Sequence, residues 1–297
     1  MTGPGGRIRL GRALGAFAHG ALRVRRDVVR AQIAASFPDR DEAWVRRTAR
    51  ACYRHFGEEF AMLAGGAPAA RAALDTLTAP PSVSRDLAER AGSGLVLVTG
   101  HLGNWELAGA FAARHAAFTT VAQRQRGAVG RRTAELRRGL GIDVVYRDEG
   151  AGRVTRALRD GRCVGLVADQ RAASGLAVPF LGRPAPTHVG PARLALRAGV
   201  PLVFCAVVRE AGGYELLWEP LDPSVLASGD PAAVTAGWVG ALERAVRRRP
   251  GQYFWFHRRW GTAGSAERYE QILGAGREAA GAPGGSRSFS ERQAGGT

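Results

Sequence analysis

The chain has 297 residues, of which 45% are hydrophobic and 23% are charged, an ordinary composition for a folded protein with a sizeable core. Its 42 basic residues are all arginine and outnumber 26 acidic residues, so the net charge is +16. An arginine-rich surface favours an anionic partner such as a nucleic acid, a membrane face or an acidic substrate. The complete lack of lysine excludes a P-loop nucleotide site.

No segment of the sequence is predicted to cross a membrane. Residues 13–22 carry no charge but supply only half of the about 20 apolar residues that a span requires. The longest apolar run elsewhere, residues 198–208, is bounded by Arg197 and Arg209. We therefore expect a chain that can lie on a membrane without crossing it.

The three cysteines, Cys52, Cys163 and Cys205, are widely spaced, and each lies in an apolar stretch. This setting predicts buried free thiols in a compartment that is reducing, as the cytoplasm is. There is no CxxC motif and no Cys/His cluster with the spacing of a zinc site. We therefore expect no metal and no other cofactor.

The first part of the chain is predicted to be helical. Arginine and apolar residues recur at helical spacing from Ile8 to Ile33, and a second helix follows from about residue 42 to 63. Asp39 or Asp41 is the expected N-cap of this second helix. A basic amphipathic helix such as the first one lies in a membrane interface, or packs on the domain with a solvated basic face. The pattern leaves both readings open.

From residue 94 onward, short apolar strands alternate with helices. Strands are expected at residues 94–100, 118–125, 142–146, 162–170, 201–210 and 214–221, and helices at 104–116, 131–141, 151–161, 190–199 and about 231–249. This order predicts an α/β fold with a mostly parallel central sheet, helices on both faces and an N-terminal helical pair. We divide the chain into a helical, membrane-associating segment (1–80), an α/β core of the same domain (81–274) and a disordered tail (275–297) rich in Gly, Ala, Ser and Arg.

The stretch "VLVTGHLGNWELA" (96–108) places polar side chains where a buried strand gives way to a helix. Ligands of open α/β sheets bind beyond the carboxyl ends of strands, and His101 stands at such an end. Glu106 falls in the first turns of the next helix, so its carboxylate can reach the imidazole and fix its tautomer. Gly100 and Gly103 permit a tight turn, and Asn104 is a candidate N-cap. Such a pair can activate a hydroxyl by general base catalysis.

Structural roles are expected for the other candidate residues, except for a group of aromatic residues near the C-terminus. "HFGEE" (55–59) also pairs His with Glu, but within a long helix, where a structural role is expected. His19, His115, His188 and His257 lack a comparable setting, so packing or surface roles are expected for them. The aromatic residues of "YFWFHRRW" (253–260) belong to the core or contact a ligand.

Several blocks resemble the bacterial late acyltransferases of lipid A synthesis, whose wider superfamily includes glycerolipid and phosphatidylinositol mannoside acyltransferases. "GHLGNWELAG" is similar to the HX4(D/E) block of that family. In order along the chain, four further blocks follow the family pattern: "ELRRGLG", "GLVADQ", "VPFLGRPAPTHVGPARLA" and "PGQYFWFHRRW". An early segment, "VVRAQIAASFPD", also matches, with Gln32 and Ile33 in place of the usual Asn-Leu. The resemblance covers about residues 10–272.

This resemblance implies acyl transfer from a thioester to a hydroxyl of a membrane glycolipid, without an acyl-enzyme. His101 would be the general base, and Glu106 would orient it. Arg138, or less favourably Arg137, would support the site or bind an acceptor phosphate. Asp169, at the end of the "VGLVAD" strand, matches a functionally important acidic position of the family, although it could equally cap the turn that follows.

The donor implied is acyl carrier protein or acyl-CoA, used as a co-substrate. The acceptor is a lipid A precursor or another glycolipid, such as a phosphatidylinositol mannoside or a lysophospholipid. An amphipathic helix, or the apolar segments around Phe180, would hold the fatty chain. The expected location is the cytoplasmic face of the bacterial inner membrane, as a peripheral protein.

Two other classes of protein are compatible with parts of this sequence. A nucleic-acid-binding protein would explain the charge, but no binding motif is present and the arginines are spread along the chain, so nucleic acid is not an expected partner. A lipid-binding protein of the membrane surface would keep the fold and the basic helix without using His101. The enzyme remains the preferred hypothesis.

Overall fold

The computed structural model describes residues 4–89 and 92–261, with β1 to β5, β8 and β9 in one seven-stranded sheet of order β1-β9-β8-β2-β5-β3-β4. Strands β2, β3, β4, β5 and β8 are parallel, whereas β9 runs antiparallel to β8. The predicted α/β class with a mostly parallel sheet is confirmed. The strands of this sheet are β1 (Leu77–Thr78), β2 (Leu95–Thr99), β3 (Phe118–Ala122), β4 (Asp143–Tyr146), β5 (Cys163–Val167), β8 (Leu202–Glu210) and β9 (Gly213–Pro220).

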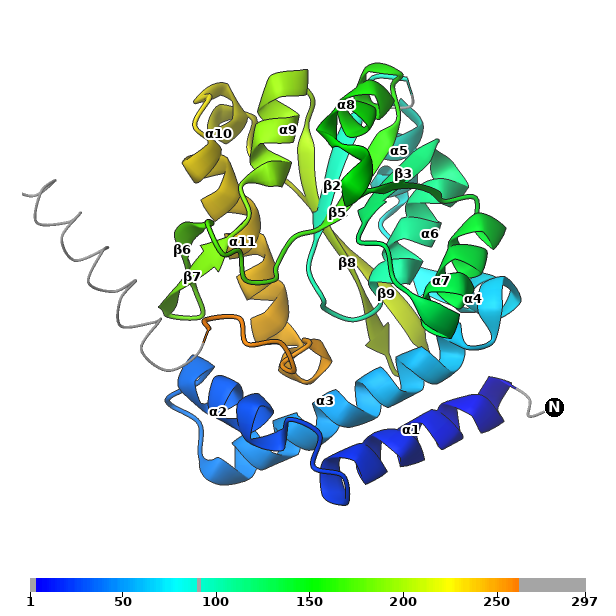
Figure 1. The fold of residues 1–297 in the computed structure, drawn as a ribbon, viewed down its shortest axis with the longest axis vertical. Coiled ribbons are helices and arrows are strands. Elements are labelled where there is room, and N and C mark those ends of the chain that lie inside the picture. The colour runs from blue at the N-terminus through cyan, green and yellow to red at the C-terminus, as the bar shows by residue number, and fades with distance from the viewer. Residues whose placement is uncertain (1–3, 90–91, 262–297) are drawn as a thin grey trace, which may run out of the picture.

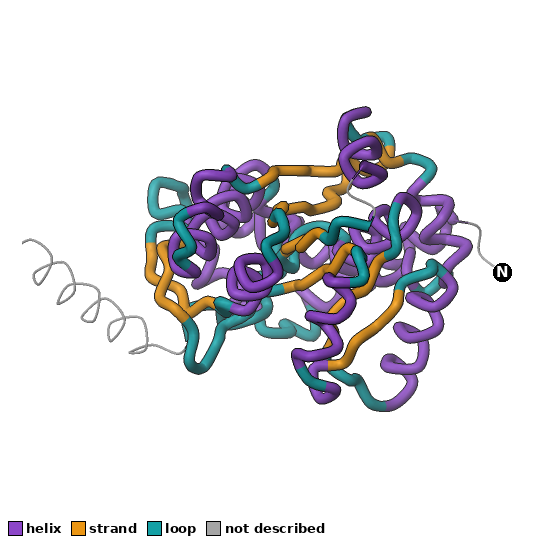
Figure 2. Tube along the Cα trace, turned by 90° about the horizontal axis from the view of Figure 1, so that it is seen from above, coloured by secondary structure: helices purple, strands orange, loops and turns teal. Residues whose placement is uncertain are grey.

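Helices cover both faces of the sheet (Figures 1 and 2). Successive residues of the buried strands point to opposite faces, so each face carries apolar side chains that a helix layer must bury. Leu95 and Leu97 of β2 belong to one apolar cluster, whereas Val96 and Val98 belong to the other. The first cluster lies under α4 (Gly66–Leu74), α5 (Pro81–Glu89), α6 (Trp105–His115) and α7 (Gly127–Gly139), and the second under α8 (Ala151–Arg159), α9 (Gly190–Ala198) and α11 (Pro231–Arg248).

The N-terminal segment differs from the expected helical pair. The pattern that predicted one helix from Ile8 to Ile33 is in fact two helices, α1 (Pro4–Gly20) and α2 (Arg26–Ser36). Between them Arg23 and Arg25 adopt a left-handed φ of 51°, which turns the chain. The second expected helix is present as α3 (Glu42–Leu63), and Asp41 caps it by accepting a bond of 2.6 Å from the backbone N–H of Trp44.

Helices α1 and α3 lie side by side across one end of the molecule, at the foot of Figure 1. Their backbones are so close that a Cβ on Gly15 would lie 2.2 Å from the carbonyl oxygen of Tyr53. Residues of α2 and α3, such as Ile33 and Phe56, are buried in the same cluster as the sheet residues Val96 and Val98. The N-terminal helices therefore close one end of the core.

Several short elements carry no clear sequence pattern. They are the hairpin β6 (Leu176–Phe180) and β7 (Arg183–Thr187), the helix α10 (Pro223–Ala227) and the 3-10 turns η1 (Arg147–Glu149) and η2 (Pro250–Gln252). All three cysteines are buried free thiols, as predicted. The proposed disordered tail, 275–297, lies outside the described residues.

Candidate active site

The turn that follows β2 is held against its neighbours on several sides. The backbone N–H of Gly103 donates to Gln252 (2.9 Å), and that of Asn104 donates to Val207 (2.7 Å). Gly103 has a φ of 61°, and a Cβ there would lie 1.9 Å from the carbonyl oxygen of Val207. Glycine is thus required at this position because the turn passes directly over β8. His101 stands at the start of this rigid turn.

The side chain of His101 is hydrogen bonded to Asp169. His101 Nδ1 lies 2.6 Å from Asp169 Oδ1, and the backbone N–H of His101 donates to Asp169 Oδ2 at 2.9 Å. Strands β2 and β5 are neighbours in register, with Thr99 opposite Val167, so residues two places beyond each strand meet. The carboxylate is buried, whereas 18% of the imidazole side chain is exposed. Of the two ring nitrogens, Nε2 is the one that does not contact the carboxylate.

Electrostatics make this imidazole more basic than usual. Burial by itself lowers the pKa of His101, but the charge and the hydrogen bond of Asp169 outweigh it, so the pKa lies above its ordinary value. Burial likewise opposes ionisation of Asp169, yet the contacts with His101 hold the pKa of that carboxyl below its usual range. The buried guanidinium of Arg259 adds further positive charge nearby. The pair has the form of a base with an orienting carboxylate.

Glu106 takes a different partner from the one expected. We predicted that Glu106 would hydrogen bond to the imidazole, but Asp169 makes that bond, and Glu106 binds Arg137 with two contacts of 3.0 and 2.6 Å. The charge of Glu106 still contributes to raising the pKa of His101. Glu106 lies in the first turn of α6, where the helix dipole favours a carboxylate. Its catalytic assignment stays a prediction.

Of the two adjacent arginines of α7, Arg137 and not Arg138 lies close to Glu106. We favoured Arg138, but its side chain is exposed, and no described residue pairs with its guanidinium. Arg137 projects inward from the last turn of α7 and forms the half-buried ion pair with Glu106. Of the two arginines, Arg137 is therefore the one that contacts Glu106, and a supporting role for either arginine stays a prediction.

Asn104 has the predicted capping role and one more. Its Oδ1 accepts from the backbone N–H of Leu107 at 3.0 Å and caps α6. Its Nδ2 donates to Glu59 of α3 at 2.6 Å, and the same carboxylate accepts from Arg209 (2.6 Å) and Tyr214 (3.0 Å). Glu59 belongs to the "HFGEE" stretch, for which a structural role was expected. The hydrogen bond from Asn104 shows that Glu59 helps to hold the turn that carries His101.

An apolar cavity of about 650 Å³ opens between α1 and α3. Its walls come from α1, the link to α2, α3 and the segment that follows η2: Leu14, Gly15, Ala18, Val24, Arg25, Tyr53, Phe56, Gly57, Phe60, Ala61, Ala64, Phe254 and Phe256. Phe254 connects it to the site, since its ring centroid lies 5.9 Å from that of His101 and its backbone N–H donates to the carbonyl of His101. The cavity thus ends one aromatic ring away from the imidazole.

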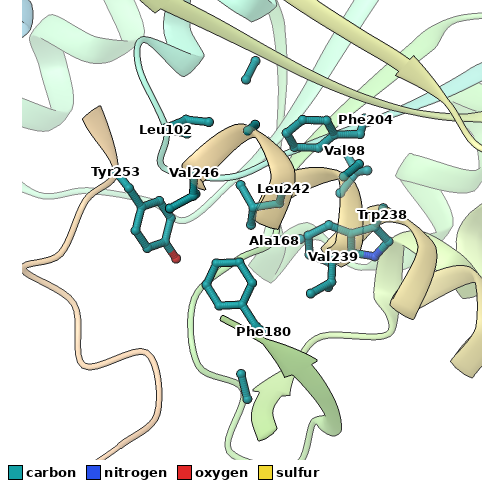
Figure 3. Packing of buried hydrophobic residues seen from close by; sticks show 14 of the residues in the cluster. Val98, Leu102, Ala168, Phe180, Phe204, Trp238, Val239, Leu242, Val246 and Tyr253 are labelled. Carbon is teal, nitrogen blue, oxygen red and sulfur yellow. The ribbon is translucent and has the colours of Figure 1, made fainter. Parts of the chain in front are cut away.

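Two expectations about apolar residues are resolved by this arrangement. Phe180 does not line a groove: it is fully buried in the core, below Leu242 and beside Tyr253 (Figure 3). The aromatic residues of 253–260 divide by position, because Tyr253, Trp255 and Trp260 are core residues whereas Phe254 and Phe256 face the cavity.

Sequence reasoning missed two polar residues near His101. Gln170 Nε2 lies 3.4 Å from His101 Nε2, and His257, for which we expected packing or a surface role, accepts a hydrogen bond from the backbone N–H of Arg171 at 3.0 Å. The "ADQ" block offered a signal for Gln170, since it follows a strand that ends beside β2. In the part of the chain that the structure describes, no three His, Cys, Asp or Glu side chains could hold a metal ion. The expectation of no cofactor stays a prediction.

Comparison with known proteins places this arrangement in a family. Residues 4–262 match the family described as bacterial lipid A biosynthesis acyltransferase. The chain belongs to this family. The resemblance seen in the five motif blocks is therefore confirmed.

Individual relatives have a narrower description. The chain is 32% identical over 184 residues to a phosphatidylinositol mannoside acyltransferase of Mycobacterium tuberculosis, covering 59% of this chain and 57% of the relative. It is 30% identical over 178 residues to the phosphatidylinositol mannoside acyltransferase of Mycolicibacterium smegmatis, covering 57% of this chain and 58% of the relative. The matched region thus spans just over half of each of these relatives. Within residues 4–89 and 92–261, no helix has the length and hydropathy needed to cross a bilayer.

Proposed function

We propose that this protein transfers a fatty acyl chain from an acyl thioester to a hydroxyl group of a membrane glycolipid. The observation that carries the proposal is the His101–Asp169 pair, which lies next to an apolar cavity and is separated from it by the ring of Phe254. Family membership supports the reaction class. Phosphatidylinositol mannoside is the acceptor to test first because the two relatives carry that name, and a lipid A precursor is the second.

The proposed chemistry starts from the outer nitrogen of the imidazole. Asp169 holds the proton on Nδ1, so the lone pair of His101 Nε2 faces the substrate and accepts the proton of the acceptor hydroxyl. The hydroxyl oxygen then attacks the thioester carbonyl, and the thiolate leaves without an acyl-enzyme. Glu106 and Arg137 support the first turn of α6 beside this centre.

The cavity between α1 and α3 is the proposed binding site of the acyl chain. Its walls are almost entirely apolar, and ligand pockets of this kind bury apolar surface with few polar contacts. Its end at Phe254 would bring the thioester carbonyl to His101. Arg25, which donates to the carbonyl of Phe256 at 2.9 Å, lies in the cavity wall and can face an anionic group of the donor or acceptor.

Acyl-CoA and acyl carrier protein both fit the positive surface as donors. CoA carries phosphates, and carrier proteins are acidic, so the net charge of +16 favours association with either one. We propose a peripheral site of action on the cytoplasmic face of the plasma membrane, where such donors and a lipid acceptor meet.

The test is a transfer assay with the purified protein. Labelled palmitoyl-CoA and palmitoyl-carrier protein are each offered with a phosphatidylinositol mannoside extract or with a lipid A precursor, and products are identified by mass spectrometry. We expect a newly acylated glycolipid that is lost in His101→Ala. A product that persists at full rate in His101→Ala would show that the imidazole is not the base and favour a lipid-binding protein with a contaminating activity.

A further inference from the structure

The turn beside His101 contains backbone N–H groups close to the imidazole. In acyl transfer the thioester carbonyl oxygen becomes an oxyanion, which backbone N–H groups of a neighbouring turn often stabilise. Here the backbone N–H groups of His101, Gly103 and Asn104 already donate to Asp169, Gln252 and Val207. These three N–H groups are thus engaged in the free protein, and a side chain beside His101 is an alternative source of a donor.

Gln170 supplies a donor at the required place. Its Nε2 lies 3.4 Å from His101 Nε2, and its side chain is exposed, so a substrate can reach it. Because Nδ1 donates to a carboxylate, Nε2 of the neutral ring is an acceptor, and it is the NH2 group of the amide that can face it. In the free protein this N–H group thus points at the nitrogen beside which the reacting oxygen must lie.

The backbone that carries Gln170 is anchored on both sides. Asp169 is buried against His101, and the backbone N–H of Arg171 donates to His257 Nε2 at 3.0 Å. Burial lowers the pKa of His257, which favours the neutral ring that this bond requires. The backbone carbonyl of His257 in turn accepts from Gln32 at 2.8 Å. A donor on such a fixed loop needs little reorganisation during the reaction.

We propose that the side-chain amide of Gln170 stabilises the oxyanion of the acyl-transfer reaction, a role that rests on the function proposed above. When the acceptor hydroxyl occupies the place beside His101 Nε2, the Gln170 N–H group is released toward the thioester carbonyl. The hydroxyl proton passes to Nε2, the new C–O bond forms, and the carbonyl electron pair moves onto the oxygen that Gln170 contacts. The tetrahedral intermediate then breaks its C–S bond, and the departing thiolate takes the proton from His101.

The test compares Gln170→Ala, Gln170→Glu and wild type with palmitoyl-CoA as donor. Transfer to a phosphatidylinositol mannoside extract and hydrolysis by water are both measured, because the same oxyanion forms in each. Removing one oxyanion donor lowers kcat by about 10²–10³-fold, so we expect this loss for Gln170→Ala in both reactions, with little change in KM. Gln170→Glu should be at least as slow, because its negative charge repels the oxyanion.

Two controls separate this role from a structural one. The thioether hexadecyl-CoA lacks the carbonyl, so it should bind Gln170→Ala as tightly as wild type. Gln125→Ala removes another exposed glutamine and should leave kcat unchanged. Thermal unfolding confirms that each variant is folded.

The outcomes distinguish the two proposals. Wild-type kcat in Gln170→Ala, or a loss confined to KM, would overturn the role of Gln170 and leave acyl transfer standing. A wild-type protein that neither transfers nor hydrolyses the acyl chain from palmitoyl-CoA or palmitoyl-carrier protein would overturn both.

Discussion

The two carboxylates of the candidate site have different hydrogen-bond partners. Asp169 is hydrogen bonded to His101, whereas Glu106 at the start of α6 pairs with Arg137 of α7. Glu106 keeps an electrostatic influence on the imidazole without a direct bond. The His and the Glu of the HX4E spacing therefore belong to two different ion pairs, His101–Asp169 and Glu106–Arg137.

The Arg137–Glu106 pair is tested with its neighbour as the control. Arg137→Ala leaves the buried Glu106 carboxylate without its partner, so we expect lower activity and a lower free energy of unfolding. A double-mutant cycle with Glu106→Ala should give a coupling of about 0.5–3 kcal/mol, as for other residues in direct contact. Arg138→Ala should stay within about 0.5 kcal/mol of wild type because its side chain is exposed. Equal effects of the two arginine substitutions would contradict the assignment.

Local sequence predicted the residues of the turn but not their partners. His101 at a strand end, Gly103 in the tight turn and Asn104 as N-cap all follow from short-range rules, and the structure has them in those places. The pairing of His101 with Asp169 depends on β5 lying beside β2 in register, which nothing in either segment specifies. The same holds for Arg137 and Arg138, since the rotation of α7 on its neighbours decides which of the two points inward.

At the scale of elements, helix α3 packs against both the turn that carries His101 and the sheet. Glu59 on this helix accepts hydrogen bonds from Asn104 of the turn and from Arg209 and Tyr214 of the sheet. One face of the same helix also supplies Phe56 and Phe60 to the apolar cavity. The helix α3 thus connects the turn that carries His101 to the apolar cavity.

Glu59→Ala tests this arrangement. The substitution leaves Arg209 and the Asn104 amide without their shared acceptor in a buried setting, and we expect a loss of about 3–5 kcal/mol in the free energy of unfolding. Chemical denaturation measures it, with Glu135→Ala on the exposed face of α7 as the control. A loss no larger than that of Glu135→Ala would show that the network is dispensable.

The cavity between α1 and α3 makes a prediction about donor chain length. Leu14 lines the cavity, so Leu14→Asp should lower kcat/KM for palmitoyl-CoA and spare a short donor such as butyryl-CoA. Leu10 lies on the same helix, is equally exposed (55% against 56%) and is outside the cavity wall. Leu10→Asp should therefore leave the ratio of the two rates unchanged. A parallel fall of both donors in Leu14→Asp would place the acyl chain elsewhere.

The break between α1 and α2 explains why the pattern alone did not locate this cavity. Helical spacing continues through Arg23 and Arg25, so the sequence reads as one helix, yet both residues adopt the left-handed conformation. Such a conformation is uncommon outside glycine, and tertiary contacts stabilise it: Arg25 bonds to the carbonyl of Phe256, more than two hundred residues away. The spacing of apolar residues within a short segment cannot predict long-range contacts of this kind.

At the scale of the whole molecule, exposed apolar side chains gather at one end. Among the described residues, the large exposed hydrophobic side chains are Leu10, Leu14, Phe17, Leu22, Val24, Phe60 and Val129, and all but Val129 belong to α1, the link to α2, or α3. Arginines alternate with them in α1 and the link. This combination favours a membrane surface with anionic lipids, close to the mouth of the cavity.

Vesicle binding tests that surface. The protein should sediment with vesicles containing phosphatidylglycerol, more weakly at high salt, and less with phosphatidylcholine alone. Phe17→Asp should weaken binding about tenfold or more, the value expected from losing one buried large apolar side chain. Val129→Asp, equally drastic but on α7, should have little effect. Equal losses in both variants would argue against an oriented membrane surface.

The most direct test of the account is the pH dependence of kcat/KM, which reports the pKa of the essential base in the free enzyme. Activity requires neutral His101, so it should fall as pH drops through the pKa of that residue, and Asp169 places this limb above the ordinary histidine value of 6.5. In Asp169→Asn, burial is no longer opposed by the carboxylate, so the limb should move to lower pH while the maximal rate falls. A limb that stays in place in Asp169→Asn, or a profile without an acid limb, would contradict the assignment of His101 and Asp169 as base and orienting residue.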